Sequence, residues 1–215
     1  MKNEINTFTI GAYDRKTGCF GIATASKYLA VGSVVPHAWA DTGLVITQSY
    51  GYTLHAEIGR KLLEKGKKPA DCIAELTEID SKKDIRQFAL IDRQGDTAAY
   101  TGTKCTGWAG HMQSKGVVCI GNMLTGEKVI EDMMDSYLHN EDLPIWERLL
   151  EALKAGERAG GDKRGRHAAA LLVVRKGGGF DGYSDRVVDL RVDDSKNPLS
   201  DLARMLFLWT SEYHK

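Results

Sequence analysis

The sequence predicts an α+β fold, a four-layer α-β-β-α sandwich in which helices lie outside two central sheets. The first observation is the order of the elements, which runs strands, helix pair, strands, helix pair, strands. This order differs from the strict alternation of a doubly wound parallel sheet and suits helices segregated in layers outside sheets. The second observation is that the strand-like segments are nearly continuous in apolar residues, which is typical of strands covered on both faces.

Two hairpins are predicted in the first block. The segments Thr7–Tyr13 and Cys19–Thr24 contain small and β-branched residues and flank a turn-rich connection at residues 14–18. Two further strand-like segments, Gly32–Ala40 and Gly43–Ser49, meet at a short turn that contains glycine. The chain is therefore expected to begin with four strands.

A pair of helices is predicted next. Apolar residues recur at helical spacing over residues 54–63, and Gly66 is typical of a helix C-terminal cap. Pro69 suits the first turn of a second helix, whose apolar stripe runs over residues 72–79.

The second half of the chain predicts more sheet and helix in turn. Strands are expected at residues 87–92, 97–101, 116–120, 168–174 and 186–192, and helices at 129–137, 145–153 and from Pro198 to Trp209. No linker, repeat or low-complexity tract stands out, so residues 1–215 are expected to form a single domain.

Charge and hydropathy bound the function. Lys and Arg number 29, and Asp and Glu also number 29, so no net field attracts nucleic acid or an anionic membrane. The first residues carry an acidic side chain and no apolar run, and no segment approaches the roughly 20 apolar residues that span a bilayer. We therefore expect a cytoplasmic protein without nucleic-acid or membrane partners.

The cysteine and histidine patterns argue against cofactors. The four cysteines are widely scattered, which favours reduced thiols, and no Cys-x-x-Cys or His-Glu-x-x-His element is present. The glycine run at residues 177–179 lacks the Lys-Ser or Lys-Thr that follows in a phosphate-binding loop. Neither a metal nor another cofactor is expected.

Several segments are specific enough to carry a family resemblance. They are Thr7-Phe8-Thr9-Ile10, residues 25–32, Trp108-Ala109-Gly110-His111, Gly121-Asn122-Met123-Leu124, residues 160–166 and residues 188–194. In order and over nearly the whole chain, they resemble the domain-of-unknown-function family 1028 (DUF1028), placed in the N-terminal-nucleophile (Ntn) hydrolase superfamily. The resemblance implies an Ntn hydrolase-like fold and, because relatives commonly assemble, a homodimer.

The same resemblance makes Thr7 the candidate nucleophile. In the superfamily, a Thr, Ser or Cys opens the first strand, and its free α-amino group is the base for its own side chain. Six residues precede Thr7, so its amine is free only if the chain is cut after Asn6. We expect the chain as written to stay uncut, because no residue before Thr7 visibly supplies cleavage chemistry. Thr7 is otherwise simply a good strand former.

The turn at residues 162–166 supplies further candidates. Proteasome-like relatives carry an aspartate followed three residues later by a small residue, and Asp162 and Gly165 match that spacing. The resemblance implies that Asp162 orients the Thr7 amine, and Arg164 or Arg166 is expected to bind a substrate carboxylate. The alternative is a solvated charged turn.

Asn122 and the Ser26-Lys27 pair are also candidates. Asn122 ends a strand, where its amide and nearby backbone amides would stabilise an oxyanion, unless it only forms a turn. A desolvated Lys27 near Thr7 would assist proton transfer, and Ser26 beside it is expected to contact substrate. The alternative for Lys27 is a side chain that extends to solvent.

Two other residues offer different chemistry. His111 lies in a glycine-containing segment with Trp108 and is expected to line the substrate pocket. Cys105 is an alternative thiol nucleophile.

The sequence therefore predicts a hydrolase of a linear amide C–N bond in a small, carboxylate-bearing substrate, with Thr7 attacking. Two alternatives stay open. One is a noncatalytic binding or scaffold protein with the Ntn fold, and the other is an enzyme that uses Cys105 or His111 in the same cleft.

Overall fold

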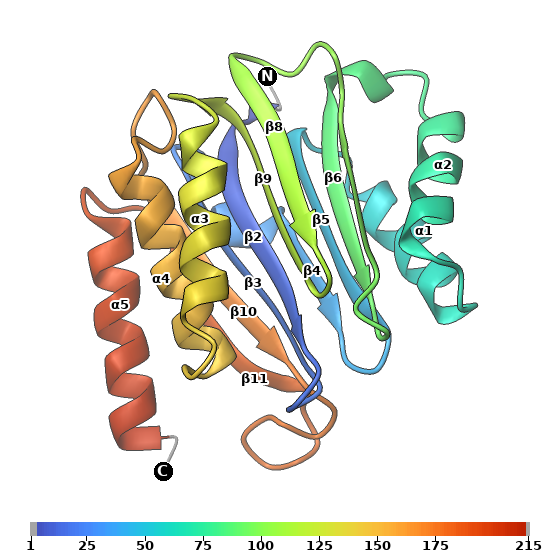
Figure 1. Cartoon of the computed structure of the whole chain (residues 1–215). Coiled ribbons are helices and arrows are strands. Elements are labelled where there is room, and N and C mark those ends of the chain that lie inside the picture. Colours follow the sequence, from blue (N-terminus) through green and yellow to red (C-terminus); the bar gives the residue numbers. More distant parts are fainter. Residues whose placement is uncertain (1–3, 214–215) are drawn as a thin grey trace.

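The computed structural model describes residues 4–213 and contains two antiparallel β-sheets and five α-helices within that range (Figure 1). The strands are β1 (Glu4–Ile5), β2 (Thr7–Asp14), β3 (Cys19–Ser26), β4 (Pro36–Trp39), β5 (Gly43–Tyr50), β6 (Arg86–Asp92), β7 (Thr97–Thr101), β8 (Trp108–Ser114), β9 (Val117–Leu124), β10 (Ala168–Val174) and β11 (Arg186–Val192). The α-helices are α1 (Leu54–Glu64), α2 (Pro69–Ile79), α3 (Lys128–His139), α4 (Ile145–Arg158) and α5 (Pro198–Leu208). The predicted mixture of helices and sheets is confirmed.

One sheet has five strands, in the order β1-β5-β6-β7 with β4 also paired to β5. The other has six, in the order β11-β10-β3-β2-β9-β8. Helices α1 and α2 pack on the five-stranded sheet, whereas α3, α4 and α5 pack on the six-stranded sheet (Figure 1). No helix in the described part of the chain is long and apolar enough to cross a membrane.

Apolar side chains fill most of the space where the two sheets meet. Phe20 and Ile22 of β3 belong to one buried cluster with Leu44 and Ile46 of β5 and Ile91 of β6. Since β2 pairs with β3 on one side and with β9 on the other, it lies in the interior of its sheet and is buried along most of its length. Thr7 is the first residue of this interior strand.

Three local predictions differ from the structure. The expected strand at residues 32–40 is interrupted: Val31–Ser33 form a 3₁₀ turn, and only Pro36–Trp39 are extended. The short strand β1 was not predicted, because two residues are too few to show a pattern. The segment from Trp108, expected to be a pocket-lining loop, is strand β8, an edge strand whose side chains are half-buried or exposed. Such a strand lacks the apolar alternation that predicts one.

Candidate functional site

Polar side chains gather where β2, β3 and β9 of one sheet face β5 and β6 of the other. We call them the buried polar cluster, and each is at most 1% exposed: Asn6, Thr7, Thr9, Thr24, Ser26, Gln48, Gln87 and Asn122. Strand register explains part of the gathering, because Thr7 lies opposite Ser26 and Thr9 lies opposite Thr24. Directly opposed residues project from the same face of a sheet. Buried polar groups are costly unless paired, so a paired cluster of this size is taken as the candidate site.

Hydroxyl groups and an amide join the first part of the cluster. The Thr9 hydroxyl donates to Gln48 Oε1 at 2.7 Å and lies 2.8 Å from the Thr24 hydroxyl. The Thr7 hydroxyl donates to the Ala25 carbonyl oxygen at 2.6 Å and lies 3.1 Å from Thr24 Oγ1. Gln48 Nε2 is 3.4 Å from the Thr7 carbonyl oxygen, so the two sheets are tied together beside Thr7.

Amide side chains continue the network across the other sheet. Gln87 Oε1 accepts hydrogen bonds from Gln48 Nε2 at 2.8 Å and from Asn122 Nδ2 at 3.0 Å. Gln87 Nε2 donates to the Gly121 carbonyl oxygen at 2.8 Å. The Asn122 Oδ1 atom is buried and has no hydrogen-bond partner among the described residues. Because the Asn122 amide nitrogen donates to Gln87, it is already used within the network.

The peptide bond before Thr7 is held by two donors. The carbonyl oxygen of Asn6 accepts a hydrogen bond from Ser26 Oγ at 2.6 Å and another from Arg164 Nη2 at 3.1 Å. Asp162 fixes this guanidinium, because its Oδ1 accepts from Arg164 Nε at 3.0 Å and its Oδ2 accepts from Nη2 at 2.6 Å. The Asp162 side chain is fully buried, and that of Arg164 is 33% exposed. A cation of fixed orientation thus lies against the carbonyl group that precedes Thr7.

The residues before Thr7 are built into the other sheet. Strand β1 pairs antiparallel with β5, with Glu4 opposite Tyr50 and Ile5 opposite Ser49. Ile5 is 6% exposed and Asn6 is 1% exposed. The Thr7 nitrogen is consequently part of a buried peptide bond in this form of the chain.

The backbone is strained next to two residues of the cluster, one in each sheet. Ser49 follows Gln48 directly and has φ 64°, and Met123 follows Asn122 directly and has φ 58°. Left-handed backbone at residues other than glycine costs on the order of 1–3 kcal/mol and persists only when the surroundings enforce it. Such strain concentrates at functional sites, which supports the assignment of the site to this end of the sheets.

The structure brings five of the sequence-predicted residues together. Thr7, Ser26 and Asn122 belong to the buried polar cluster, and Asp162 and Arg164 join it through the Asn6 carbonyl group. Two arrangements differ from expectation. Asp162 binds Arg164, which contacts the peptide bond, whereas Asp162 was expected to orient the Thr7 nitrogen directly. The Asn122 amide donates to Gln87, so the donors at the carbonyl oxygen beside Thr7 are Ser26 and Arg164.

The other sequence-predicted residues are not members of the buried polar cluster, although His111 is linked to it through Thr101, whose hydroxyl oxygen accepts a hydrogen bond from Gln87 Nε2 at 3.0 Å. Lys27 is exposed and therefore lacks the desolvation that its expected role requires. Arg166 pairs with Glu157 of α4. His111 is exposed on β8, where its Nδ1 lies 2.9 Å from Thr101 Oγ1. Burial raises the pKa of the Cys105 thiol, which leaves little thiolate at neutral pH.

Gln48 and Gln87 were missed by sequence reasoning. Each lies in a strand whose other residues include β-branched or aromatic side chains, and strand patterns give no role to a single amide. A polar residue at a position expected to be buried is the signal that would have found them.

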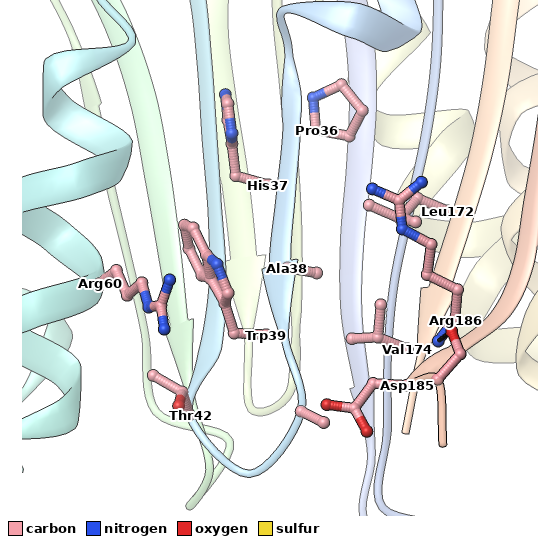
Figure 2. A pocket seen from close by; sticks show the side chains of 12 residues that line it. Pro36, His37, Ala38, Trp39, Thr42, Arg60, Leu172, Val174, Asp185 and Arg186 are labelled. Carbon is pink, nitrogen blue, oxygen red and sulfur yellow. Dashed lines mark hydrogen bonds between the residues drawn. The ribbon is translucent and has the colours of Figure 1, made fainter. Parts of the chain in front are cut away.

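A separate groove of about 460 Å³ lies between β4 and the β10–β11 hairpin (Figure 2). Trp39 and Arg60 lie on one side of it, and Leu172 and Arg186 lie on the other. Both arginines already have acidic partners, Glu64 for Arg60 and Asp189 for Arg186.

This groove is distant from Thr7. It lies beside the Val174 end of β10, whereas Ser26 pairs with Ala168 at the opposite end, roughly 20 Å away at about 3.3 Å per residue. The groove therefore does not serve the buried polar cluster.

Within residues 4–213, no group of three or more His, Cys, Asp or Glu side chains is placed to hold a metal ion. The four cysteines are free thiols, and Cys19, Cys72 and Cys119 are buried.

Comparison with known proteins finds a matching family model and a number of similar solved structures, two of which are described below. The family model, described as a family of unknown function (DUF1028), matches residues 7–202 and so begins at Thr7. Protein SPO2555 from Silicibacter pomeroyi, whose crystal structure is assigned to the same family model, has 30% sequence identity and a TM-score of 0.87. The alignment covers 97% of this chain and 91% of that one.

A more distant neighbour is Anbu (ancestral beta-subunit) from Yersinia bercovieri, with 11% identity and a TM-score of 0.43 over 95% of this chain and 97% of that one. No curated protein matched the chain. The family model covers most of the sequence, and SPO2555 resembles it over nearly its whole length. The chain therefore belongs to the DUF1028 family.

Proposed function

We propose that this protein is an Ntn-type hydrolase of a linear amide C–N bond, with Thr7 as nucleophile and a small, carboxylate-bearing substrate. In this proposal the two sheets and their helices form the four-layer α-β-β-α sandwich of that class. One observation carries the proposal. The carbonyl oxygen of the peptide bond before Thr7 is bound by Ser26 Oγ and Arg164 Nη2, as an oxyanion would be.

In this proposal removal of residues 1–6 is the first step of the mechanism, and it replaces the expectation that the chain stays uncut, because Thr7 itself supplies the attacking group. The Thr7 hydroxyl attacks the Asn6 carbonyl carbon, and negative charge develops on the oxygen held by Ser26 and Arg164. The C–N bond then breaks, the hydroxyl proton ends on the Thr7 nitrogen, and an ester joins Asn6 to Thr7. Water hydrolyses this ester, which yields a carboxylate on Asn6 and a free hydroxyl and amine on Thr7.

The freed amine then serves as the base for substrate hydrolysis. An α-amino group has an ordinary pKa of about 7.7–8.0, so much of it accepts a proton near neutral pH. Thr7 would attack the substrate carbonyl carbon, with Ser26 and Arg164 holding the oxyanion and Asp162 holding Arg164 in place. Gln48 and Gln87 would position the strand that carries Thr7.

Intact-mass measurement together with amide hydrolysis tests the proposal. The full chain and a chain that begins at Thr7 are each assayed against a panel of small amides, with Thr7→Ala and Thr7→Ser as variants. We expect activity only where the Thr7 amine is free, none in Thr7→Ala, and partial activity in Thr7→Ser. Hydrolysis by the uncut chain that survives Thr7→Ala would make Thr7 structural.

A noncatalytic binding or scaffold protein is the second candidate. It is favoured by the Thr7 hydroxyl itself, which donates to the Ala25 carbonyl oxygen at 2.6 Å, while the adjacent nitrogen lies in a peptide bond. In that arrangement the hydroxyl has an acceptor but no base. A chain beginning at Thr7 that folds but hydrolyses no amide would support this candidate.

Assembly and location complete the proposal. We take the protein to be a cytoplasmic homodimer, and light scattering at high concentration tests the dimer against the 23.7 kDa mass of one chain.

A further inference from the structure

We infer that Glu4, Ile5 and Asn6 occupy the acyl-side binding site of the enzyme, and that its substrate is a short extended peptide amide. The residue at the hydrolysed bond would be a small uncharged one such as asparagine, preceded by a branched aliphatic residue. The inference rests on the proposed function, because it takes Thr7 as the nucleophile and the Asn6 carbonyl group as the position of the reacting carbonyl group.

The edge of β5 provides a site for an extended backbone. Strand β4 pairs with one half of this edge, from Ile46 to Gly43, and β1 pairs with the other half at Ser49 and Tyr50. The edge of β5 at Ser49 and Tyr50 is therefore only two residues long, and it can pair with another extended segment once residues 1–6 are removed. Addition of a peptide to a sheet edge uses backbone hydrogen bonds that every sequence supplies.

The site beneath Ile5 selects an aliphatic side chain. Ile5 is 6% exposed and belongs to the apolar cluster between the sheets. A Cβ atom at Gly51 would lie 2.7 Å from Ile5 Cδ1, so the absence of a side chain at Gly51 makes the room that Ile5 fills. Burying a side chain of this size contributes on the order of 1.5–3 kcal/mol. A charged residue at this position would lose that contribution and its hydration.

The site of Asn6 disfavours a charged side chain. Asn6 is 1% exposed, and its Oδ1 atom has no hydrogen-bond partner among the described residues. The two donors nearby, Ser26 and Arg164, bind the Asn6 backbone oxygen. A carboxylate in place of the amide would therefore be buried without a hydrogen-bond donor, which strongly disfavours aspartate.

Glu4 contributes less to the selection. Its carboxylate accepts a hydrogen bond from the Thr106 hydroxyl, and the residue is only half-buried. Partly exposed polar contacts of this kind stabilise little. Recognition thus rests on the backbone, on the aliphatic residue and on the absence of charge at the position of Asn6.

Calorimetric titration with acetyl-Glu-Ile-Asn, which ends in a free carboxylate, tests the inference on the chain that begins at Thr7. We expect this peptide to bind that chain and to bind the intact chain, kept uncut by Thr7→Ala, at least tenfold more weakly, since the intact chain fills its own site. Replacing the isoleucine of the peptide by lysine, or the asparagine by aspartate, should weaken binding at least tenfold. Ser26→Ala and Arg164→Ala should each weaken it similarly, whereas Arg158→Ala, an exposed arginine at the end of α4, should not.

An intact chain with Ile5→Gly provides a second measurement if the shortened chain does not fold. Both chains in this comparison carry Thr7→Ala so that they stay uncut. With Ile5→Gly the segment 4–6 is held less tightly, so acetyl-Glu-Ile-Asn should bind that chain at least tenfold more tightly than it binds the chain with Ile5 in place. Equal binding to both, with circular dichroism showing both folded, overturns the inference.

The anilide of acetyl-Glu-Ile-Asn separates the inference from the proposed function. If the Thr7 chain hydrolyses other small amides while the peptide neither binds nor inhibits, the inference is overturned and the proposed function stands. If the peptide acid binds with the stated selectivity but no amide is hydrolysed, the proposed function fails and the binding site stands. Hydrolysis of the anilide, inhibited by the peptide acid, supports both.

Discussion

Arg164 donates a hydrogen bond to the carbonyl oxygen of Asn6, 158 residues earlier in the chain, at 3.1 Å. The contact joins the loop before β10 to the peptide bond that precedes β2. Asp162 binds the same guanidinium through both of its oxygens and so fixes the position of Arg164. Arg164 in turn holds the carbonyl group that is bonded to the Thr7 nitrogen.

Asp162→Ala should impair both stability and hydrolysis. It removes the buried acceptor of two Arg164 nitrogens, and hydrogen bonds to charged groups contribute about 1.5–3 kcal/mol. We expect the free energy of unfolding in urea to fall by about 2 kcal/mol and any Thr7-dependent hydrolysis to fall at least tenfold. Asp142→Ala, an exposed carboxylate, is the control and should change neither. Unchanged urea unfolding in Asp162→Ala would show that the Arg164 contact is not formed.

Thr9→Val should destabilise the chain by about 1–3 kcal/mol, because it leaves Gln48 Oε1 without its hydroxyl donor in a buried position. The shapes of threonine and valine are alike, so the loss reports the hydrogen bond rather than packing. Thermal unfolding of this variant is compared with that of Thr103→Val, an exposed threonine. Equal melting temperatures in the two variants would show that the hydrogen bond between Thr9 and Gln48 does not stabilise the fold.

His55 predicts a pH dependence of stability. The residue is fully buried, and burial lowers its pKa from 6.5 to about 4, although Asp80 lies 3.2 Å away. In the unfolded chain the imidazole has its ordinary pKa of about 6.5, so the unfolded state binds a proton that the folded state does not. The free energy of unfolding should therefore fall as pH drops from about 6.5 to about 4, by about 3 kcal/mol in the limit.

Urea unfolding at pH 7 and pH 4.5 measures this slope. His55→Phe should reduce the slope, whereas His167→Phe, at a half-exposed site, should keep it. A slope that is equal in His55→Phe and the unchanged chain would assign it to other groups.

Phe8→Ala should cost about 3–5 kcal/mol, since Phe8 is 1% exposed beneath α4 and follows Thr7 directly. Phe207→Ala removes the same atoms from a side chain that is 68% exposed and should change stability by less than about 0.5 kcal/mol. Chemical denaturation of both variants gives the comparison. Similar losses in the two would mean that Phe8 is not a core residue.

Local pattern predicted much of the fold. The strands at Thr97–Thr101, Ala168–Val174 and Arg186–Val192 begin and end where expected, because turn residues bound each run of strand formers. Strand β8 was missed because its mostly half-buried and exposed residues carry no alternation. The pairing of β1 with β5 depends on residues more than 40 positions apart, which no local pattern reports.

The candidate site was predictable only where a family motif marked it. Thr7, Asp162 and Arg164 were identified through such segments. The residues that each of them contacts are set by strand register and loop geometry, which the sequence does not show. Gln48 and Gln87 were not identified, because their importance comes from burial opposite one another on two neighbouring strands. That juxtaposition exists only after β5 and β6 pair.

The two strands that share the edge of β5 also bear on solubility. While Glu4 and Ile5 are paired, the backbone groups of Ser49 and Tyr50 on that edge are protected. A cut after Asn6 would release this cover and leave a short unpaired edge beside the apolar cluster to which Ile5 belongs, and another chain can add a strand to such an edge. Glu4 and Ile5 would then have a second role beside occupying the site, since they cover these backbone groups until the cut is made.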